Sequence, residues 1–260
     1  MFIFRMLASK LMTILSNNRD FKNMYTFPDI AGKYFWLYGS WEAWNIKILK
    51  QHFFSNTSDG LFLDIGANLG CYTINLAEIF REVWSFEPAP IASSILYANV
   101  EANEINNCVL ITKGVANENG TIPLNVVPAN SGLSSVKNNI ENSKQIEIEI
   151  VRLDDAVPLD ESVAFIKIDV EGFELDVLMG AEEILRLNEA VIQIEVDGVQ
   201  EIEKARDIVK FLKKCGYSKF YQRKDNAFNR IKRRFYIQDT EIEPLQLTVG
   251  KFYQAVWVTK

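Results

Sequence analysis

The sequence predicts an α/β protein with a doubly wound, mostly parallel sheet, an antiparallel edge and an N-terminal helical cap. Two observations predict this fold. From about residue 60, short apolar runs alternate with helix-like segments, and strands that alternate with helices form right-handed βαβ units in a parallel sheet. Later runs alternate apolar and polar residues, which is typical of strands at an antiparallel edge.

The individual elements follow from the length and periodicity of each run. Strands are expected at Leu61–Ile65, Val83–Phe86, Val109–Thr112, Ile146–Val151, Phe165–Ile168, Ala190–Val196 and Tyr217–Tyr221. Helices are expected at Cys71–Phe80, Ile91–Ala102, Leu175–Leu187 and Glu201–Lys214. Residues 1–59 do not show this alternation of strand and helix patterns. They carry a dense group of aromatic residues, so we expect them to form the cap. Residues 60–260 then form the main domain.

The composition excludes several classes of function. A net charge of −6 offers no general attraction to a phosphate backbone, so no nucleic-acid partner is expected. The three cysteines, at positions 71, 108 and 215, are too far apart for a zinc motif and favour a reducing, cytoplasmic location. The single histidine, His52, excludes metal sites built from several histidines and argues against a Ser-His-Asp hydrolase.

No transmembrane segment is expected, because the apolar runs near the N-terminus are too short to span a bilayer. These runs are interrupted by Arg5 and Lys10, which favours an amphipathic helix packed on the domain. Peripheral membrane contact stays open as the alternative.

The most informative motif follows the first expected strand, at the edge where doubly wound sheets bind ligands. Here Asp64 precedes Gly66, Asn68 and Gly70. The glycines permit a tight turn and a close approach of the backbone to a nucleotide-like ligand. Asp64 is placed to accept hydrogen bonds from that ligand or from its bound water. Three residues separate the glycines, which differs from G-x-G-x-x-G and weakens the interpretation as a dinucleotide site.

An acidic residue ends the second expected strand. Glu87 follows the glycines at the distance, about 20 positions, at which an acid accepts both hydrogens of a ribose diol. Pro88 then fits the first turn of the following helix. The glycine motif and the acidic second strand together indicate an adenosine-type ligand.

Four segments resemble the FkbM-type methyltransferases in their residues and in their order along the chain: FLDIGANLGCYT, SFEP, IKIDVEGFEL and VIQIEVDG. The resemblance runs from about Gly60 to Tyr221 and implies a class I, Rossmann-like methyltransferase with S-adenosylmethionine as donor. It implies a hydroxyl acceptor, most often on a sugar or glycan, with a secondary metabolite as the alternative. The residues expected to hold the cofactor are Asp64, Gly66, Asn68, Gly70, Tyr72, Thr73, Glu87, Pro88 and Asp169.

Two carboxylates, Asp169 and Glu171, follow the expected strand at Phe165–Ile168. An aliphatic hydroxyl is a poor nucleophile until a base removes its proton. We predict Glu171 as that base and Asp169 as the residue that places the methionine portion or the acceptor, with the reverse assignment open. Asp169, Glu195 and Asp197 offer oxygen ligands for a divalent ion such as Mg²⁺. Carboxylates that are solvated or bonded to loop amides are the favoured interpretation, and dependence on a divalent metal stays open.

Other features favour plain structural interpretations. Lys167 either pairs with one of these acids or points to solvent. Asn99 is expected on an exposed helix face, with a role near adenine as the alternative. The aromatic residues at 34–44 are expected in the core rather than stacked on sugar rings. The basic residues at 223–234 favour a solvated face over an anion site. The polar loop at 130–135 is a surface turn or part of the acceptor entrance.

Two competing classes of function stay open. The first is an NAD-dependent oxidoreductase, which the spacing of the glycines and the two carboxylates after the strand disfavour. The second is a non-catalytic module that binds adenosylmethionine or a partner, because a preserved cofactor pocket does not prove turnover. The complete set of polar anchors disfavours this second class.

Overall fold

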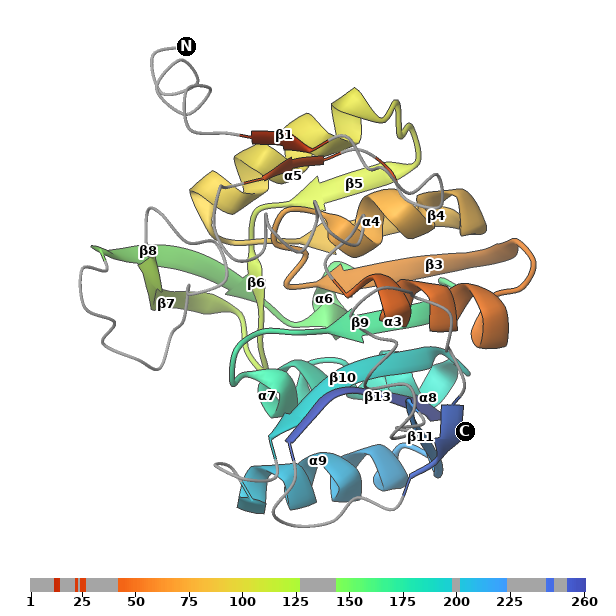
Figure 1. Ribbon diagram of the computed structural model, residues 1–260. Coiled ribbons are helices and arrows are strands. Elements are labelled where there is room, and N and C mark those ends of the chain that lie inside the picture. The colour runs from red at the N-terminus through yellow and green to blue at the C-terminus, as the bar shows by residue number, and fades with distance from the viewer. Residues whose placement is uncertain are drawn as a thin grey trace.

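The computed structural model describes residues 12–14, 22, 24–26, 42–126, 144–197, 202–223, 242–245 and 252–260. Its main sheet has the strand order β12-β11-β13-β10-β9-β3-β4-β5 (Figure 1). The strands are β3 (Ser58–Ile65), β4 (Phe80–Phe86), β5 (Cys108–Ile111), β9 (Val163–Ile168), β10 (Val191–Asp197), β11 (Lys219–Arg223), β12 (Ile242–Pro244) and β13 (Phe252–Thr259). Strands β10, β9, β3, β4 and β5 are parallel, and β13, β11 and β12 form an antiparallel edge. The predicted fold class is confirmed.

Helices cover both faces of this sheet (Figure 1). On one face lie α3 (Ala43–Ile48), η1 (Leu49–Phe53), α4 (Cys71–Leu76), η2 (Ala77–Ile79) and α5 (Pro90–Ala102). On the other lie α6 (Leu153–Ala156), α7 (Glu174–Met179), α8 (Glu182–Leu187) and α9 (Ile202–Lys214). A strand covered on both sides must be apolar on both sides. Accordingly, Phe62 of β3 packs toward α4 and its neighbour Leu63 packs toward the second group.

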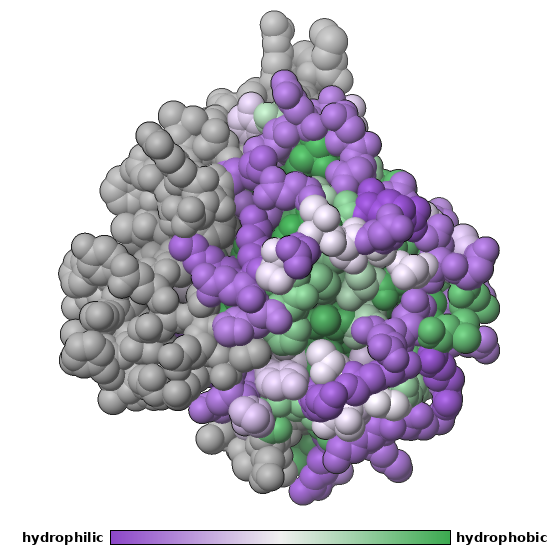
Figure 2. Space-filling view, turned by 90° about the vertical axis from the view of Figure 1, so that its right-hand side faces the viewer, coloured by the Kyte–Doolittle hydropathy of each residue, from purple (hydrophilic) through white to green (hydrophobic). Residues whose placement is uncertain are grey.

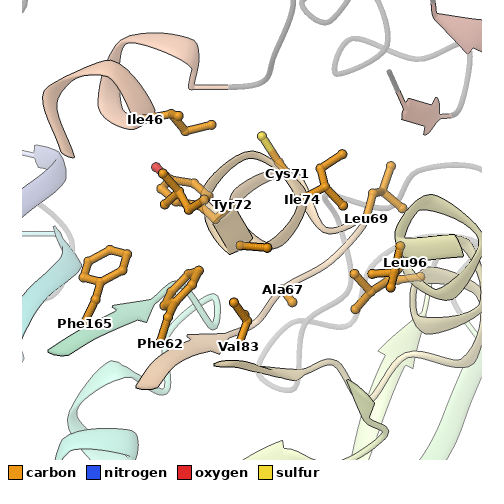
Figure 3. Packing of buried hydrophobic residues seen from close by; sticks show 14 of the residues in the cluster. Ile46, Phe62, Ala67, Leu69, Cys71, Tyr72, Ile74, Val83, Leu96 and Phe165 are labelled. Atoms are coloured by element: carbon orange, nitrogen blue, oxygen red, sulfur yellow. The ribbon is translucent and has the colours of Figure 1, made fainter. Parts of the chain in front are cut away.

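The aromatic centre of the first face supports the helix that follows the glycine motif. Phe62 stacks on Phe165 of β9 with ring centroids 4.7 Å apart, and its ring lies 5.3 Å from that of Phe80. Figure 3 shows Phe62 and Phe165 on the strands below α4, with Tyr72 projecting from the helix. Burial of each large apolar side chain contributes about 1.5–3 kcal/mol, so this cluster anchors α4 on the sheet.

Two smaller sheets flank the main one. Strands β6 (Gly114–Val115), β7 (Gly120–Val126) and β8 (Lys144–Val151) form one, in which β7 and β8 pair antiparallel and project from the domain (Figure 1). Strands β1 (Met12–Ile14) and β2 (Met24–Thr26) form the other. On the side of the domain away from the β7–β8 hairpin, apolar residues lie among hydrophilic ones (Figure 2).

The prediction of one helix at Leu175–Leu187 is wrong in one respect. The segment forms two helices, α7 and α8, which are separated at Gly180. The carbonyl of Gly180 accepts a hydrogen bond from Asp154 N at 2.9 Å. Ile184 N, which would bond this carbonyl in a continuous helix, donates to Asp154 Oδ1 at 3.1 Å. A side chain from α6 therefore interrupts the helical hydrogen bonds, which no periodicity in the segment indicates.

The described part of the cap differs from a purely helical one, since the β1–β2 hairpin accompanies α3. This hairpin also corrects the expectation for Asn99, which is fully buried. Its Oδ1 accepts from Tyr25 N at 2.6 Å, and its Nδ2 donates to Leu69 O at 2.8 Å. Asn99 thus joins the hairpin to the loop after β3, a contact that depends on chain crossing rather than on helix periodicity.

Some expectations concern residues outside those that the structure describes: the N-terminal residues 1–11, the aromatic residues 34–41, the loop 130–135, the basic residues 224–234 and the side chain of Asp197. Within the described part of the chain, every helix is too short or too polar to span a membrane.

Candidate functional site

The loop after β3 adopts a conformation that ordinary residues disfavour. Gly66, Asn68 and Gly70 have φ values of 72°, 51° and 87°, so three alternate positions lie in the left-handed region. Glycine tolerates this region, and asparagine tolerates it better than most other residues, which explains Asn68 at the middle position. A Cβ at Gly66 would lie 1.9 Å from Asp169 O, so this glycine also lets the loop pack against the end of β9.

Asp64 lies at the end of β3 and is fully buried. Its Oδ2 accepts hydrogen bonds from Thr73 N at 3.1 Å and Thr73 Oγ1 at 2.7 Å. Its Oδ1 has no hydrogen-bond partner among the described residues, although Lys167 Nζ lies 3.7 Å away. Burial raises the pKa of Asp64, opposed by Lys167 and by the bonds from Thr73. Thr73, which is expected to contact the cofactor, thus directs its N–H and its hydroxyl to Asp64.

Glu87 connects the end of β4 to the glycine loop. Its Oε2 accepts from Asn68 N at 2.9 Å, and its Oε1 accepts from Ala89 N at 2.8 Å. Each carboxylate oxygen keeps a lone pair, so the two remain able to accept a ribose diol. Burial raises the pKa of Glu87 to about 7 against the effect of these two backbone bonds.

Pro88 does not lie in the first turn of the next helix, as predicted. Helix α5 begins at Pro90, which occupies the first turn instead. The hydrogen bond from Ala89 N to Glu87 Oε1 spans Pro88, which precedes the helix, and α5 starts at Pro90, one residue before the expected Ile91.

A line of buried polar side chains crosses the sheet beneath α4. The cross-strand neighbours Ser85, Asp64, Lys167, Gln193 and Trp257 lie at one register of five adjacent strands, and we name them the polar row. All five are at most 4% exposed. Buried polar groups require partners, and the hydroxyls of Tyr72 and Thr73 in the first turn of α4 supply them to three members of the row: Asp64, Ser85 and Gln193.

Lys167 is the cation of the polar row, and the structure decides between the two predicted positions: it pairs with acids and does not point to solvent. Its Nζ donates to Gly66 O at 2.7 Å and lies 3.4 Å from Asp169 Oδ2. Burial opposes its charge, but Asp169, Asp64 and Glu42 outweigh this effect and hold the pKa of Lys167 above its usual range. Lys167 therefore ties the glycine loop to the acidic end of β9.

Tyr72 links the polar row to the cap. Gln193 Nε2 donates to the Tyr72 hydroxyl at 2.7 Å, and this hydroxyl donates to Glu42 Oε2 at 2.5 Å. At the other end, Trp257 Nε1 donates to Gln193 Oε1 at 3.0 Å. Tyr72 was expected to line the cofactor site, and its hydroxyl is instead engaged with protein groups on both sides.

The predicted carboxylates gather where β9 and β10 end. Asp169 is paired with Lys167, whereas Glu171 is exposed and has a left-handed backbone with φ 50°. Partial burial, with the negative charges of Asp169 and Glu174, raises the pKa of Glu171 to about 7. Partial burial and four acidic neighbours raise the pKa of Glu195 to about 8: Asp169, Glu171, Glu174 and Glu42. The site therefore contains more carboxylates than neighbouring cations can neutralise.

A clamp holds the loop that carries Asp169 and Glu171. Glu174 Oε1 accepts from Gly172 N at 2.8 Å, and Lys204 of α9 donates to Gly172 O at 2.5 Å and to Glu174 Oε2 at 2.7 Å. Sequence reasoning missed this pair. Glu174 stands inside the IKIDVEGFEL segment, which was a usable signal, but Lys204 has none because its helix is distant in the chain.

No group of three or more potential ligands that could hold a metal ion occurs within the described part of the chain. Asp169 and Glu195 are both near the end of the sheet, and the side chain of Asp197 lies outside the described residues. The arrangement of these residues therefore supplies no argument for a divalent ion.

The site suits an adenosine-type cofactor that carries positive charge. The buried Oδ1 atoms of Asp64 and Asn68 have no partners among the described residues, so each can accept a hydrogen bond from a ligand or its water. Glu87 offers acceptors at the end of the next strand, and the acidic surplus around Lys167 favours a cation. Together, fold and site fit the class of α/β domains that bind such a cofactor at the carboxyl ends of their parallel strands.

Comparison with known proteins specifies the family. A family model described as the methyltransferase FkbM domain matches residues 64–219. The chain is 26% identical over 148 residues to Methyltransferase 1 of Beauveria bassiana (strain ARSEF 2860), which covers 48% of this chain and 59% of the relative. It is also 26% identical over 160 residues to Methyltransferase sdnD of Sordaria araneosa, with coverage of 48% and 62%. The chain thus spans about three fifths of these relatives.

The solved structure of methyltransferase FkbM from Methylobacillus flagellatus KT is similar with a TM-score of 0.48 and 16% identity. The similarity covers 77% of this chain and 43% of that chain. Because the family model matches more than half of the sequence, the chain belongs to the FkbM methyltransferase family.

Proposed function

We propose that this methyltransferase transfers a methyl group from S-adenosylmethionine to a hydroxyl oxygen, with a sugar hydroxyl as the acceptor. When bound, S-adenosylmethionine supplies a methyl group on a positively charged sulfur. Transfer of this methyl group to the acceptor oxygen leaves S-adenosylhomocysteine. Glu87 would accept the ribose diol, and the glycine loop would lie against the adenosine. The acidic end of β9 would face the methionine portion and the reacting oxygen.

The observation that carries the proposal is the contrast between Asp169 and Glu171. Lys167 ties Asp169 to the polar row, which suits a positioning role. Glu171 is exposed at the end of the sheet and, in the described part of the chain, has no ion-pair partner. Its pKa of about 7 matches the requirement for a base that operates near neutral pH. Glu171 would therefore accept the proton of the acceptor hydroxyl while Asp169 holds the geometry.

The first experiment is a calorimetric titration of the purified protein with S-adenosylmethionine, S-adenosylhomocysteine and, as a control, NADH. We expect saturable binding of the first two and none of NADH. Binding of NADH alone would favour an oxidoreductase. No binding of any ligand by folded, ligand-free protein would refute the proposed cofactor.

The second experiment measures methylation of sugar and small-molecule alcohols with and without Mg²⁺. We expect Glu171→Gln to lower turnover by about 100-fold or more, with cofactor affinity within about twofold of wild type. Glu87→Ala should instead weaken cofactor binding through loss of the diol contacts. Equal loss of cofactor affinity in both variants would contradict this division of roles. Cofactor binding without methylation of any acceptor would favour a non-catalytic module.

A further inference from the structure

Glu42 is a buried carboxylate that precedes α3, outside the segment that the family model matches. It is 7% exposed and has φ 53°, a left-handed conformation that glutamate rarely adopts. Figure 3 shows Tyr72 projecting from α4 toward Ile46 of α3, which brings its hydroxyl to the Glu42 carboxylate. The cap thus contributes a charged group beside the polar row.

Only one assignment of donors and acceptors is consistent for the hydrogen bonds that join Trp257 to Gln193, Tyr72 and Glu42. The indole N–H of Trp257 is only a donor, so Gln193 must present its oxygen to Trp257 and its amide N–H to Tyr72. The hydroxyl proton of Tyr72 therefore points to Glu42 Oε2, which must accept it. Any proton carried by Glu42 then resides on Oε1. This oxygen is the one that can respond to a ligand.

The charges around Glu42 do not balance. Glu42, Asp64 and Asp169 all interact with Lys167, the one cation that acts on Glu42 among the described residues. Burial, together with the negative charge of Asp169, raises the pKa of Glu42 to about 7, opposed by Tyr72, Lys167 and Asn45. Three carboxylates beside one cation leave an acidic surplus, which a bound cation would neutralise.

Two buried polar atoms also point to a ligand. Asp64 Oδ1 is fully buried without a hydrogen-bond partner in the described residues. The Nδ2 atom of Asn45, one turn after Glu42, acts on the Glu42 carboxylate but has no partner there in hydrogen-bond geometry. An amide donor next to a carboxylate acceptor matches an α-amino acid, whose carboxylate accepts and whose ammonium donates. Unsatisfied buried polar groups are costly, so such a pair favours a zwitterionic ligand over an apolar one.

We propose that Glu42 Oε1 binds the α-ammonium group of the cofactor's methionine portion, so that the segment before the domain completes the cofactor site. This inference rests on the proposed function, because it assumes an aminoacyl-bearing adenosine cofactor. Tyr72 is then a positioning residue, which orients the Glu42 carboxylate and receives its own orientation from Gln193. The adenosine end is held by the glycine loop and Glu87 without help from the cap.

The test uses adenosine ligands with and without the amino-acid end, and the matched pair with a neutral sulfur is S-adenosylhomocysteine and methylthioadenosine. The full chain and its Glu42→Gln variant are titrated with S-adenosylmethionine, S-adenosylhomocysteine and methylthioadenosine, which lacks both the ammonium and the carboxylate. We expect Glu42→Gln to weaken the first two by tenfold or more and to leave methylthioadenosine within twofold. Tyr72→Phe keeps the carboxylate but removes its orienting proton, so a smaller loss with the same ligand pattern is expected. Glu101→Gln, an exposed change on α5, is the matched control.

Two outcomes would overturn the inference. Unchanged affinity of Glu42→Gln for S-adenosylmethionine would remove Glu42 from the cofactor site. Loss of methylthioadenosine binding by the same factor would mean that Glu42 supports the whole pocket and does not bind the ammonium. If wild type bound none of the three ligands, the proposed function itself would fail, which these two results do not imply.

Discussion

Replacing Glu42 by glutamine should stabilise the free protein at alkaline pH, because it removes a buried carboxylate whose charge is poorly compensated. The pKa of Glu42 is raised from 4.5 to about 7 in the folded chain. Each pKa unit corresponds to about 1.4 kcal/mol, so the ionised group costs the folded state about 3 kcal/mol. Glutamine keeps an oxygen for the Tyr72 hydroxyl and carries no charge.

The sign of the pH dependence follows from proton binding. Between pH 4.5 and about 7 the folded protein holds a proton on Glu42 that the unfolded chain has lost. The unfolding free energy of wild type therefore falls as pH rises through this window. Relative to wild type, Glu42→Gln should gain about 1 kcal/mol at pH 5 and about 3 kcal/mol at pH 8.

Urea unfolding of both proteins at the two pH values measures this difference. The exposed variant Glu101→Gln should stay within about 0.5 kcal/mol of wild type at both. A Glu42→Gln variant that is no more stable at pH 8, or equally stabilised at both pH values, would refute the reasoning. Higher stability together with weaker cofactor binding is the expected signature of a residue kept for function.

Three other changes test the site. Gly66→Ala places a Cβ 1.9 Å from a backbone carbonyl and should abolish cofactor binding, whereas Gly120→Ala, with no atom within 4 Å, should behave as wild type in the same titration. Thr73→Val removes the 2.7 Å hydrogen bond to Asp64 and should lower the unfolding free energy by about 1–3 kcal/mol; an unchanged urea midpoint would contradict this. Because the pKa of Glu87 is about 7 and only the ionised form accepts both diol hydrogens, cofactor affinity should fall about tenfold from pH 8 to pH 6, and a constant affinity would refute the role of Glu87.

The order of strands and helices could be predicted from sequence because each depends on local periodicity. β3, β4, β9 and α5 lie within a few residues of their expected bounds, since a strand covered on both faces is an apolar run between turn residues. The division of α7 from α8 could not be predicted. It depends on Asp154, which is distant in the chain and bonds the backbone where the helix breaks.

The separate β6–β8–β7 sheet and the strand β13 also escaped prediction. Pairing of a strand depends on which other strand reaches it, so the alternation that predicts a strand at Ile146–Val151 does not show that β8 pairs with β6 and β7. The same reason applies to Asn99, whose burial depends on the β1–β2 hairpin crossing α5.

By itself, the sequence determined the fold class, the glycine loop and the identity of most carboxylates at the ends of the strands, because a strand places the residues that follow it at one edge of the sheet. Only the tertiary structure decided how these groups share charge. It brought Lys167 between Asp64 and Asp169, aligned the polar row across five strands, and added Glu42 from a segment with no motif. Electrostatic interactions depend on distance through space and on burial. The spacing of residues along the chain predicts neither of these quantities.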